Sequence, residues 1–190
     1  MAQMAKANRS DEIKTPLFIA SYPNCIDPVP SMNDESILEY QLTALFPKAT
    51  TNMDVLKGAI AALAKKAFGD ATDMSFLQLP IADGDKPNTK GIVVDANRGH
   101  WVMRMKSKYA PSIYGSDGKT VLRNQEELRP GNLMRAIVQF YTYDNKKRGV
   151  GATLLAAFKQ GDGEPLIGQG AKDYSDRFAE DAIAVGGDLF

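Results

Sequence analysis

The chain has very few of the residues on which many catalytic and metal sites depend. Of its 190 residues, one is cysteine, one is histidine and one is tryptophan. Because Cys25 has no second cysteine to pair with, an intrachain disulfide is impossible and a reducing compartment is expected. His100 is the sole candidate for a histidine-based triad, metal site or proton shuttle. Its place beside Trp101 in an alternating segment is more typical of an ordinary surface histidine.

Long apolar runs and nucleotide-binding motifs are missing as well. No uninterrupted apolar stretch is long enough to cross a bilayer, and residues 1–12 are polar where a signal peptide would be apolar. We therefore expect a soluble, cytoplasmic protein. The sequence contains neither a phosphate loop of the Gly-x-x-x-x-Gly-Lys type nor a dinucleotide-binding glycine fingerprint, so no cofactor is expected.

Net charge is absent too, but the charges are unevenly distributed. Lys and Arg number 23 and Asp and Glu number 23, whereas nucleic-acid-binding domains usually carry a basic excess. No Lys, Arg or His follows Arg177, so the body of the chain has a basic surplus once the acidic end is set aside. Basic residues gather at 98–108 and 146–148. A zero sum therefore does not exclude a polyanionic ligand.

Hydrophobic periodicity in the first half predicts strands and one helix. Met53, Leu56, Ile60 and Leu63 recur at three or four residues, and Thr51 and Asp54 have the spacing of a capping box. The helix is expected over residues 54–68. Before it, apolar runs predict strands over 17–22 and 38–46, with a rigid proline-rich loop over 23–31.

The second half of the chain is rich in strand patterns. In the run from His100, Trp101 and Met103 alternate with Arg104 and Lys106, which predicts a strand with an apolar face and a basic face. Further segments are a strand over 92–96, a long polar loop over 115–131, and a hairpin of strands 133–143 and 150–158 with a basic tip.

This pattern predicts a mainly β protein, because five or six strands and one inserted helix suit a small, mostly antiparallel barrel better than alternating α/β units. We expect a flexible N-terminus over residues 1–14, one barrel domain over 15–170 and an acidic tail over 171–190.

The tail is expected to be disordered and able to bind a partner. Its carboxylates repel one another, and the paired glycines at 186 and 187 disfavour an ordered helical end. A mobile chain end of this kind can enter a basic, hydrophobic pocket on another protein. The tail residues predicted to do so are Glu180, Asp181, Asp188, Leu189 and Phe190.

Acidic clusters offer one enzymatic alternative. Asp83, Asp85 and Asp95 could gather a divalent cation for a metal-dependent nucleic-acid enzyme. However, Asp83-Gly84-Asp85 is also a favourable turn sequence, in which aspartate bonds to its own backbone. We favour turns, and we predict no metal site and no catalytic residue.

Aromatic and basic residues share faces of the predicted strands. Arg135, Tyr141 and Tyr143 lie on one face of their strand, opposite Val138 and Phe140. Single strands are bound without sequence preference where cations follow the phosphates and aromatic rings stack on bases. A generic interaction domain fits the same pattern equally well. The residues predicted to bind DNA are Arg104, Lys106, Lys108, Arg135, Tyr141, Tyr143, Lys146, Lys147 and Arg148.

Several motifs resemble one known family. The most specific are the strand end Tyr141-Thr-Tyr143-Asp144-Asn145 and the turn Gly161-Asp162-Gly163-Glu164-Pro165-Leu166, preceded by Ala20-Ser21-Tyr22-Pro23 and Pro80-Ile-Ala-Asp83-Gly84-Asp85. Over about residues 15–168 the chain is similar to the tailed-phage single-stranded DNA-binding proteins.

The resemblance implies an oligonucleotide-binding (OB-fold) barrel. It also implies non-enzymatic, sequence-independent coating and protection of single-stranded DNA during phage replication or recombination in an infected bacterial cell. The tail is similar to acidic tails that end in phenylalanine and dock replication proteins such as polymerase or helicase. A metal-dependent enzyme and a structural phage protein stay open as alternatives, as does self-association into a homo-oligomer.

Overall fold

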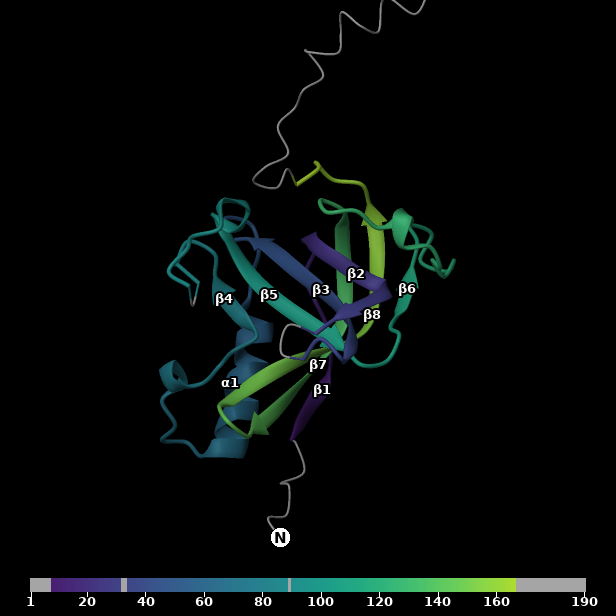
Figure 1. Cartoon of the computed structure of the whole chain (residues 1–190). Coiled ribbons are helices and arrows are strands. Elements are labelled where there is room, and N and C mark those ends of the chain that lie inside the picture. Colours follow the sequence, from purple (N-terminus) through teal and green to yellow (C-terminus); the bar gives the residue numbers. More distant parts are fainter. Residues whose placement is uncertain (1–7, 32–33, 89, 167–190) are drawn as a thin grey trace, which may run out of the picture.

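The computed structural model describes residues 8–31, 34–88 and 90–166, which form one eight-stranded sheet and one α-helix (Figure 1). The strands are β1 (Arg9–Lys14), β2 (Phe18–Pro30), β3 (Leu38–Pro47), β4 (Ile81–Asp83), β5 (His100–Ser107), β6 (Ser112–Tyr114), β7 (Leu133–Asp144) and β8 (Arg148–Gly161). The helix is α1 (Asp54–Phe68), and single 3-10 turns lie at Met74–Phe76, Asp95–Asn97 and Gln125–Glu127. The predicted mainly β class is confirmed. No helix in these described ranges is long and apolar enough to span a membrane.

Five of the described strands close into a barrel. Around the ring the order is β7, β2, β3, β5, β8 and back to β7, and every pairing is antiparallel except that of β5 with β8. In chain order, β3 and β5 are the second and third strands of the ring, and β7 and β8 are the fourth and fifth. A five-stranded barrel of this kind is the architecture of the OB-fold.

The seam between β5 and β8 has the shortest register in the ring. One register pair, Lys106 with Thr153, joins the two strands. Elsewhere along the seam, β4 pairs with the first half of β5, and Gln78 forms a bridge with Gly149 of β8. Residues 78–83 therefore lie between β5 and the β7–β8 hairpin and complete the wall of the barrel.

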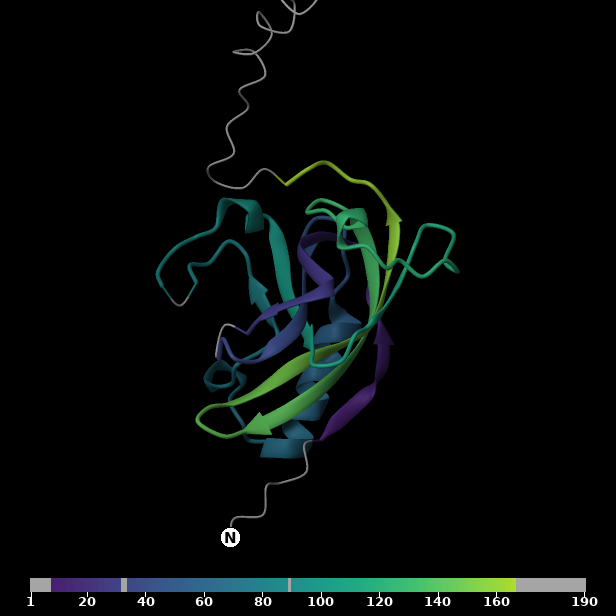
Figure 2. The same cartoon turned by 45° about the vertical axis from the view of Figure 1, so that its right-hand side comes forward.

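The interior follows the two-residue period of the strands. On β7, Met134, Ala136, Val138 and Phe140 are almost fully buried, and the residues between them are partly exposed. The buried face of α1 packs against the same core beside β7, β8 and β1 (Figures 1 and 2). Each large apolar side chain buried in this way contributes about 1.5–3 kcal/mol.

The helix prediction was correct, but its expected cap was not. The helix begins at Asp54 and ends at Phe68, as its periodicity predicts. The N-cap residue is Met53, whose side chain makes no cap hydrogen bond. Asn52, just before it, accepts a hydrogen bond on its Oδ1 from the Asp54 N–H at 2.7 Å. The capping-box spacing of Thr51 and Asp54 therefore did not locate the N-cap residue.

The expected flexible N-terminus over 1–14 was wrong for its last part. Residues 9–14 form β1, which pairs with β7 from Arg9–Tyr141 to Lys14–Ile137. Ile13 packs against the core, and this burial holds the segment on the sheet. The domain therefore begins before residue 15. Residues 1–7 and the predicted tail over 171–190 lie outside the described residues.

Two further segments differ from the sequence-based expectation. The proline-rich stretch over 23–30 continues β2 rather than forming a loop. Pro23 and Pro28 lie where the register with β3 is interrupted, and Pro30 is the last residue of the strand, paired with Leu38. The strand expected over 92–96 is a loop with a 3-10 turn. Ile92 and Val94 are 57% and 38% exposed, so they gain no burial that would favour a strand.

Gly84 sits where no side chain fits. A Cβ at this position would lie 2.0 Å from the Asn97 carbonyl oxygen and 2.7 Å from that of His100. We expect Gly84→Ala to lower the free energy of unfolding by about 1–3 kcal/mol, because backbone must move to admit the methyl group. The matched control is Gly58→Ala in α1, where a Cβ meets nothing within 4 Å. That substitution should stabilise the protein by about 0.5–1 kcal/mol. Equal effects in denaturant unfolding would contradict this account.

Candidate nucleic-acid interface

Basic side chains lie on the outer face of the β3–β5 pair. Thr43 is opposite Arg104 and Gln41 is opposite Lys106, while Leu42 and Met105 between them are buried in the core. The alternation therefore points Arg104 and Lys106 away from the core. Arg104 is exposed and has no ion-pair partner among the described residues. Its charge is available to an anion from outside the protein.

Lys106 is less available than Arg104. Its Nζ lies 3.3 Å from Oε2 of Glu39, whose side chain is 8% exposed. Gln41 also donates a hydrogen bond to Glu39, at 3.3 Å. Part of the Lys106 charge is therefore compensated inside the protein.

The predicted residues of β7 face another side of the barrel. β7 is two strands away from β5 through β8 and three strands away through β3 and β2, so outward side chains of the two strands diverge. Lys106 on β5 is paired with Thr153 on β8, and Thr153 is paired with Gln139 on β7. Along this row the backbones of β5 and β7 are therefore about 10 Å apart. Arg135 lies further toward the start of β7, where its Nε donates to Oε1 of Gln160 at 3.4 Å. The structure thus separates Arg135 from Arg104.

Tyr141 and Tyr143 lie over glycines of β8. A Cβ at Gly151 would be 2.4 Å from the Tyr141 ring, and a Cβ at Gly149 would be 2.5 Å from the Tyr143 hydroxyl. The Tyr143 hydroxyl also donates to Gln78 Oε1 at 3.4 Å, and partial burial raises the pKa of Tyr143. Aromatic rings that cover glycines stabilise a cross-strand pair. Both rings thus have a structural role and remain partly exposed.

The hairpin tip and the end of β5 carry the remaining predicted cations. Lys108, Lys146 and Lys147 are exposed. The Arg148 side chain has two partners within the protein. Its Nε lies 3.1 Å from Oδ2 of Asp144, and its guanidinium lies 6.0 Å from the Phe68 ring centre. Because the hairpin end bridges to Gln78, it stands beside the segment that pairs with β5.

Two exposed tyrosines of the described residues were not assigned from the sequence. Tyr22 on β2 is 69% exposed, and Tyr109, just after β5, is 84% exposed. Both had signals that could have identified them. Tyr22 belongs to the family-like motif Ala-Ser-Tyr-Pro, and Tyr109 directly follows Lys108 in the basic run.

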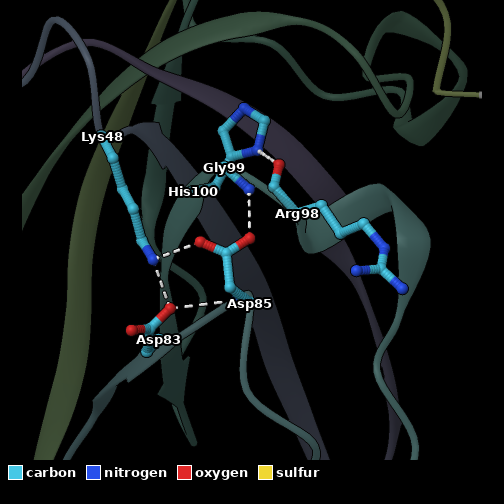
Figure 3. Close-up of polar contacts among 6 residues, drawn as sticks. All are labelled: Lys48, Asp83, Asp85, Arg98, Gly99 and His100. Atoms are coloured by element: carbon cyan, nitrogen blue, oxygen red, sulfur yellow. Dashed lines mark hydrogen bonds and ion pairs between the residues drawn. The ribbon is translucent and has the colours of Figure 1, made fainter.

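The acidic residues considered as a cation site instead hold a turn. Figure 3 shows the Lys48 ammonium between the carboxylates of Asp83 and Asp85, which it contacts directly, the latter at 2.6 Å. Asp85 also accepts from the Gly99 N–H at 2.8 Å. Lysine and these hydrogen bonds hold the pKa of both carboxyls below 3.8.

Asp95, the third residue of the considered cation site, pairs elsewhere. Its Oδ1 lies 3.0 Å from Arg98 Nε. Across residues 8–31, 34–88 and 90–166, no group of three or more His, Cys, Asp or Glu side chains could hold a metal ion. The preferred interpretation of Asp83-Gly84-Asp85 as a turn is confirmed by the hydrogen bond from the Asp85 N–H to Asp83 Oδ1.

Comparison with protein families decides the relationship of this chain. Residues 12–188 match the family described as the single-stranded DNA-binding protein of Enterobacter phage Enc34. The chain belongs to this family. None of the curated proteins matches it. The family assignment confirms the resemblance to phage single-stranded DNA-binding proteins that the motifs indicated.

Solved structures show the same fold. The single-stranded DNA-binding protein from bacteriophage Enc34 has a TM-score of 0.63 and 24% identity, over 88% of this chain and 89% of that chain. The same protein in complex with single-stranded DNA has a TM-score of 0.65 and 23% identity, over 82% and 89%. The bacteriophage T7 single-stranded DNA-binding protein gp2.5 has a TM-score of 0.57 and 13% identity, over 87% and 93%. The expected OB-like barrel is thereby confirmed.

The ion pairs of Lys48 generate a pH-dependent prediction. Because the folded-state pKa values of Asp83 and Asp85 are lowered, their pairing with Lys48 stabilises the fold above pH 3.8 and is lost as the pH falls through the folded values. Lys48→Met should lower Tm near neutral pH. The Tm difference from wild type should narrow as the pH falls below 3.8. A difference that stays constant across this range would show that the ion pairs do not stabilise the fold.

Proposed function

We propose that this protein binds single-stranded DNA without sequence preference and without enzymatic activity, and coats and protects exposed strands during phage replication or recombination in the infected bacterial cell. Family membership supports the ligand class. The observation that carries the proposal for this chain is Arg104, an exposed cation on the outer face of β3 and β5 that has no ion-pair partner within the described part of the chain. The second and third strands of an OB-fold, with their flanking loops, form the surface that binds oligonucleotides.

The geometry supports a simple mechanism. Cations on the barrel wall replace the counterions of the phosphates, so affinity depends on salt rather than on base identity. In this proposal Arg104 and Lys106 form the centre of the phosphate track. Exposed Lys108 extends it along β5, and the hairpin tip with Lys146, Lys147 and Arg148 flanks it. Arg135, Tyr141 and Tyr143 remain predictions for a strand that continues around the barrel.

The tail residues Glu180, Asp181, Asp188, Leu189 and Phe190 complete the proposal. Their acidic and apolar character suits docking to replication proteins, and their negative charge suits competition with DNA for the basic face. Both roles can operate in one protein, because DNA bound to the barrel would displace the tail and leave it free for a partner.

The Arg104 assignment predicts a change in salt dependence. Arg104→Gln should weaken binding of a mixed-sequence single strand and reduce the slope of log affinity against log salt by about 0.7, because one phosphate contact is lost. The matched control is Arg123→Gln, which removes another exposed arginine, from the loop after β6. Fluorescence anisotropy at four or more salt concentrations, which together span about a tenfold range, measures the slope for each variant. Equal slopes for the two variants would contradict the proposed position of the phosphate track.

The proposed role of the tail predicts that shortening it increases the affinity for DNA, whereas Arg104→Gln decreases it. Deletion of residues 186–190 should tighten binding of the same oligonucleotide, most clearly at low salt, because an anionic competitor is removed. A chain with Asp188→Asn alone is the control for charge, and Phe190→Ala is the control for the apolar end. Unchanged affinity in the deletion would show that the tail does not compete with DNA.

A further inference from the structure

Strand β2 contains an extra residue directly beside the β3–β5 face. Ser21 is opposite Thr43 and Asn24 is opposite Gln41, so β2 takes three steps where β3 takes two. Within this interval lies Tyr22, whose φ is 51°, the one positive value among the non-glycine residues that the structure describes. A bulge of this kind changes the direction of a side chain.

The bulge moves an aromatic ring from the core side to the solvent side. Ala20 and Cys25 are fully buried. Ser21, which is 8% exposed, is paired with Thr43 on the other face of the sheet, so regular alternation would turn the next residue, Tyr22, inward. Instead Pro23 is buried in this position, and the side chain of Tyr22 is 69% exposed. A left-handed backbone is unfavourable for a residue with a Cβ. The fold thus retains an unfavourable conformation and gains little burial of the ring in return.

The bulge in β2 lies on the same part of the barrel wall as Arg104. Ser21 is opposite Thr43, and Thr43 is opposite Arg104. With neighbouring strands about 4.8 Å apart, Tyr22 stands about 10 Å from the Arg104 backbone across the same wall. Local strain that is not explained by packing is concentrated at ligand-binding positions.

We propose that Tyr22 stacks on a nucleobase and so selects unpaired strands over duplex DNA. This inference rests on the proposed function. A base inside a duplex has neighbours on both faces, whereas a single strand can offer a free face to the ring. Other tyrosines fit this role less well: Tyr141 and Tyr143 cover glycines, and Tyr109 lies beyond the end of β5 without a positive φ.

The test uses substitutions in the full chain that separate the ring from the backbone. Tyr22→Gly removes the ring and suits a positive φ, so its Tm should be no lower than that of the wild type. Its affinity for a mixed-sequence single strand should fall about 5- to 100-fold, the range for loss of one stacked base. Tyr22→Phe keeps the ring and should bind within about twofold of wild type. Affinity for the matching duplex should not change in either variant.

The outcomes that overturn the inference are distinct from failure of the proposed function. If the wild type binds the single strand and Tyr22→Gly binds it equally well, the stacking role is wrong. If Tyr22→Gly loses Tm and weakens single-strand and duplex binding by the same factor, Tyr22 is a structural residue. If the wild type does not bind the single strand at low salt, the proposed function itself fails.

Discussion

Closure of the sheet by β7, which pairs with both β2 and β8, is the constraint on which the other features depend. A closed barrel has an interior, and the strand period then assigns every second residue to the core and its neighbours to the outside. That assignment places Arg104 outside and Met105 inside from adjacent positions. It also separates outward residues of β5 from those of β7, although all of them belong to one sheet.

The closure is incomplete along the β5–β8 seam, and the surrounding structure compensates for this. Residues 78–83 lie along the seam and bond both to β5 and to the end of the hairpin. Their position is in turn fixed by the turn at Asp83-Gly84-Asp85, where Lys48 neutralises two carboxylates and Gly84 allows close backbone approach (Figure 3). The acidic motif therefore acts in folding, next to the surface proposed to bind DNA.

Much of this fold could be predicted from the sequence wherever the period was unambiguous. The helix over 54–68 and the strand from Leu133 were recognisable because burial follows one face in each. The loop over 92–96 was not, since its apolar residues resemble a strand but remain exposed. The pairing of β1 with β7 was missed because an edge strand with polar residues has no clear periodicity.

The site was only partly predictable for a related reason. A basic face can be read from alternation, and this gave Arg104 and Lys106. Which strands become neighbours cannot be read in this way, so residues of β7 were grouped with those of β5. Tyr22 was missed because a bulge breaks the alternation from which a residue's direction is inferred.

The central claim is that the outer face of β2, β3 and β5 binds single-stranded DNA. Photocrosslinking of the full chain to an oligonucleotide that carries 5-iodouracil, followed by mapping of the modified peptides, tests this claim most directly. We expect crosslinks in the segments 18–30 and 100–109, which include Tyr22 and the end of β5. Crosslinks confined to the loop over 115–131, or to the outer face of β7 alone, would contradict the account.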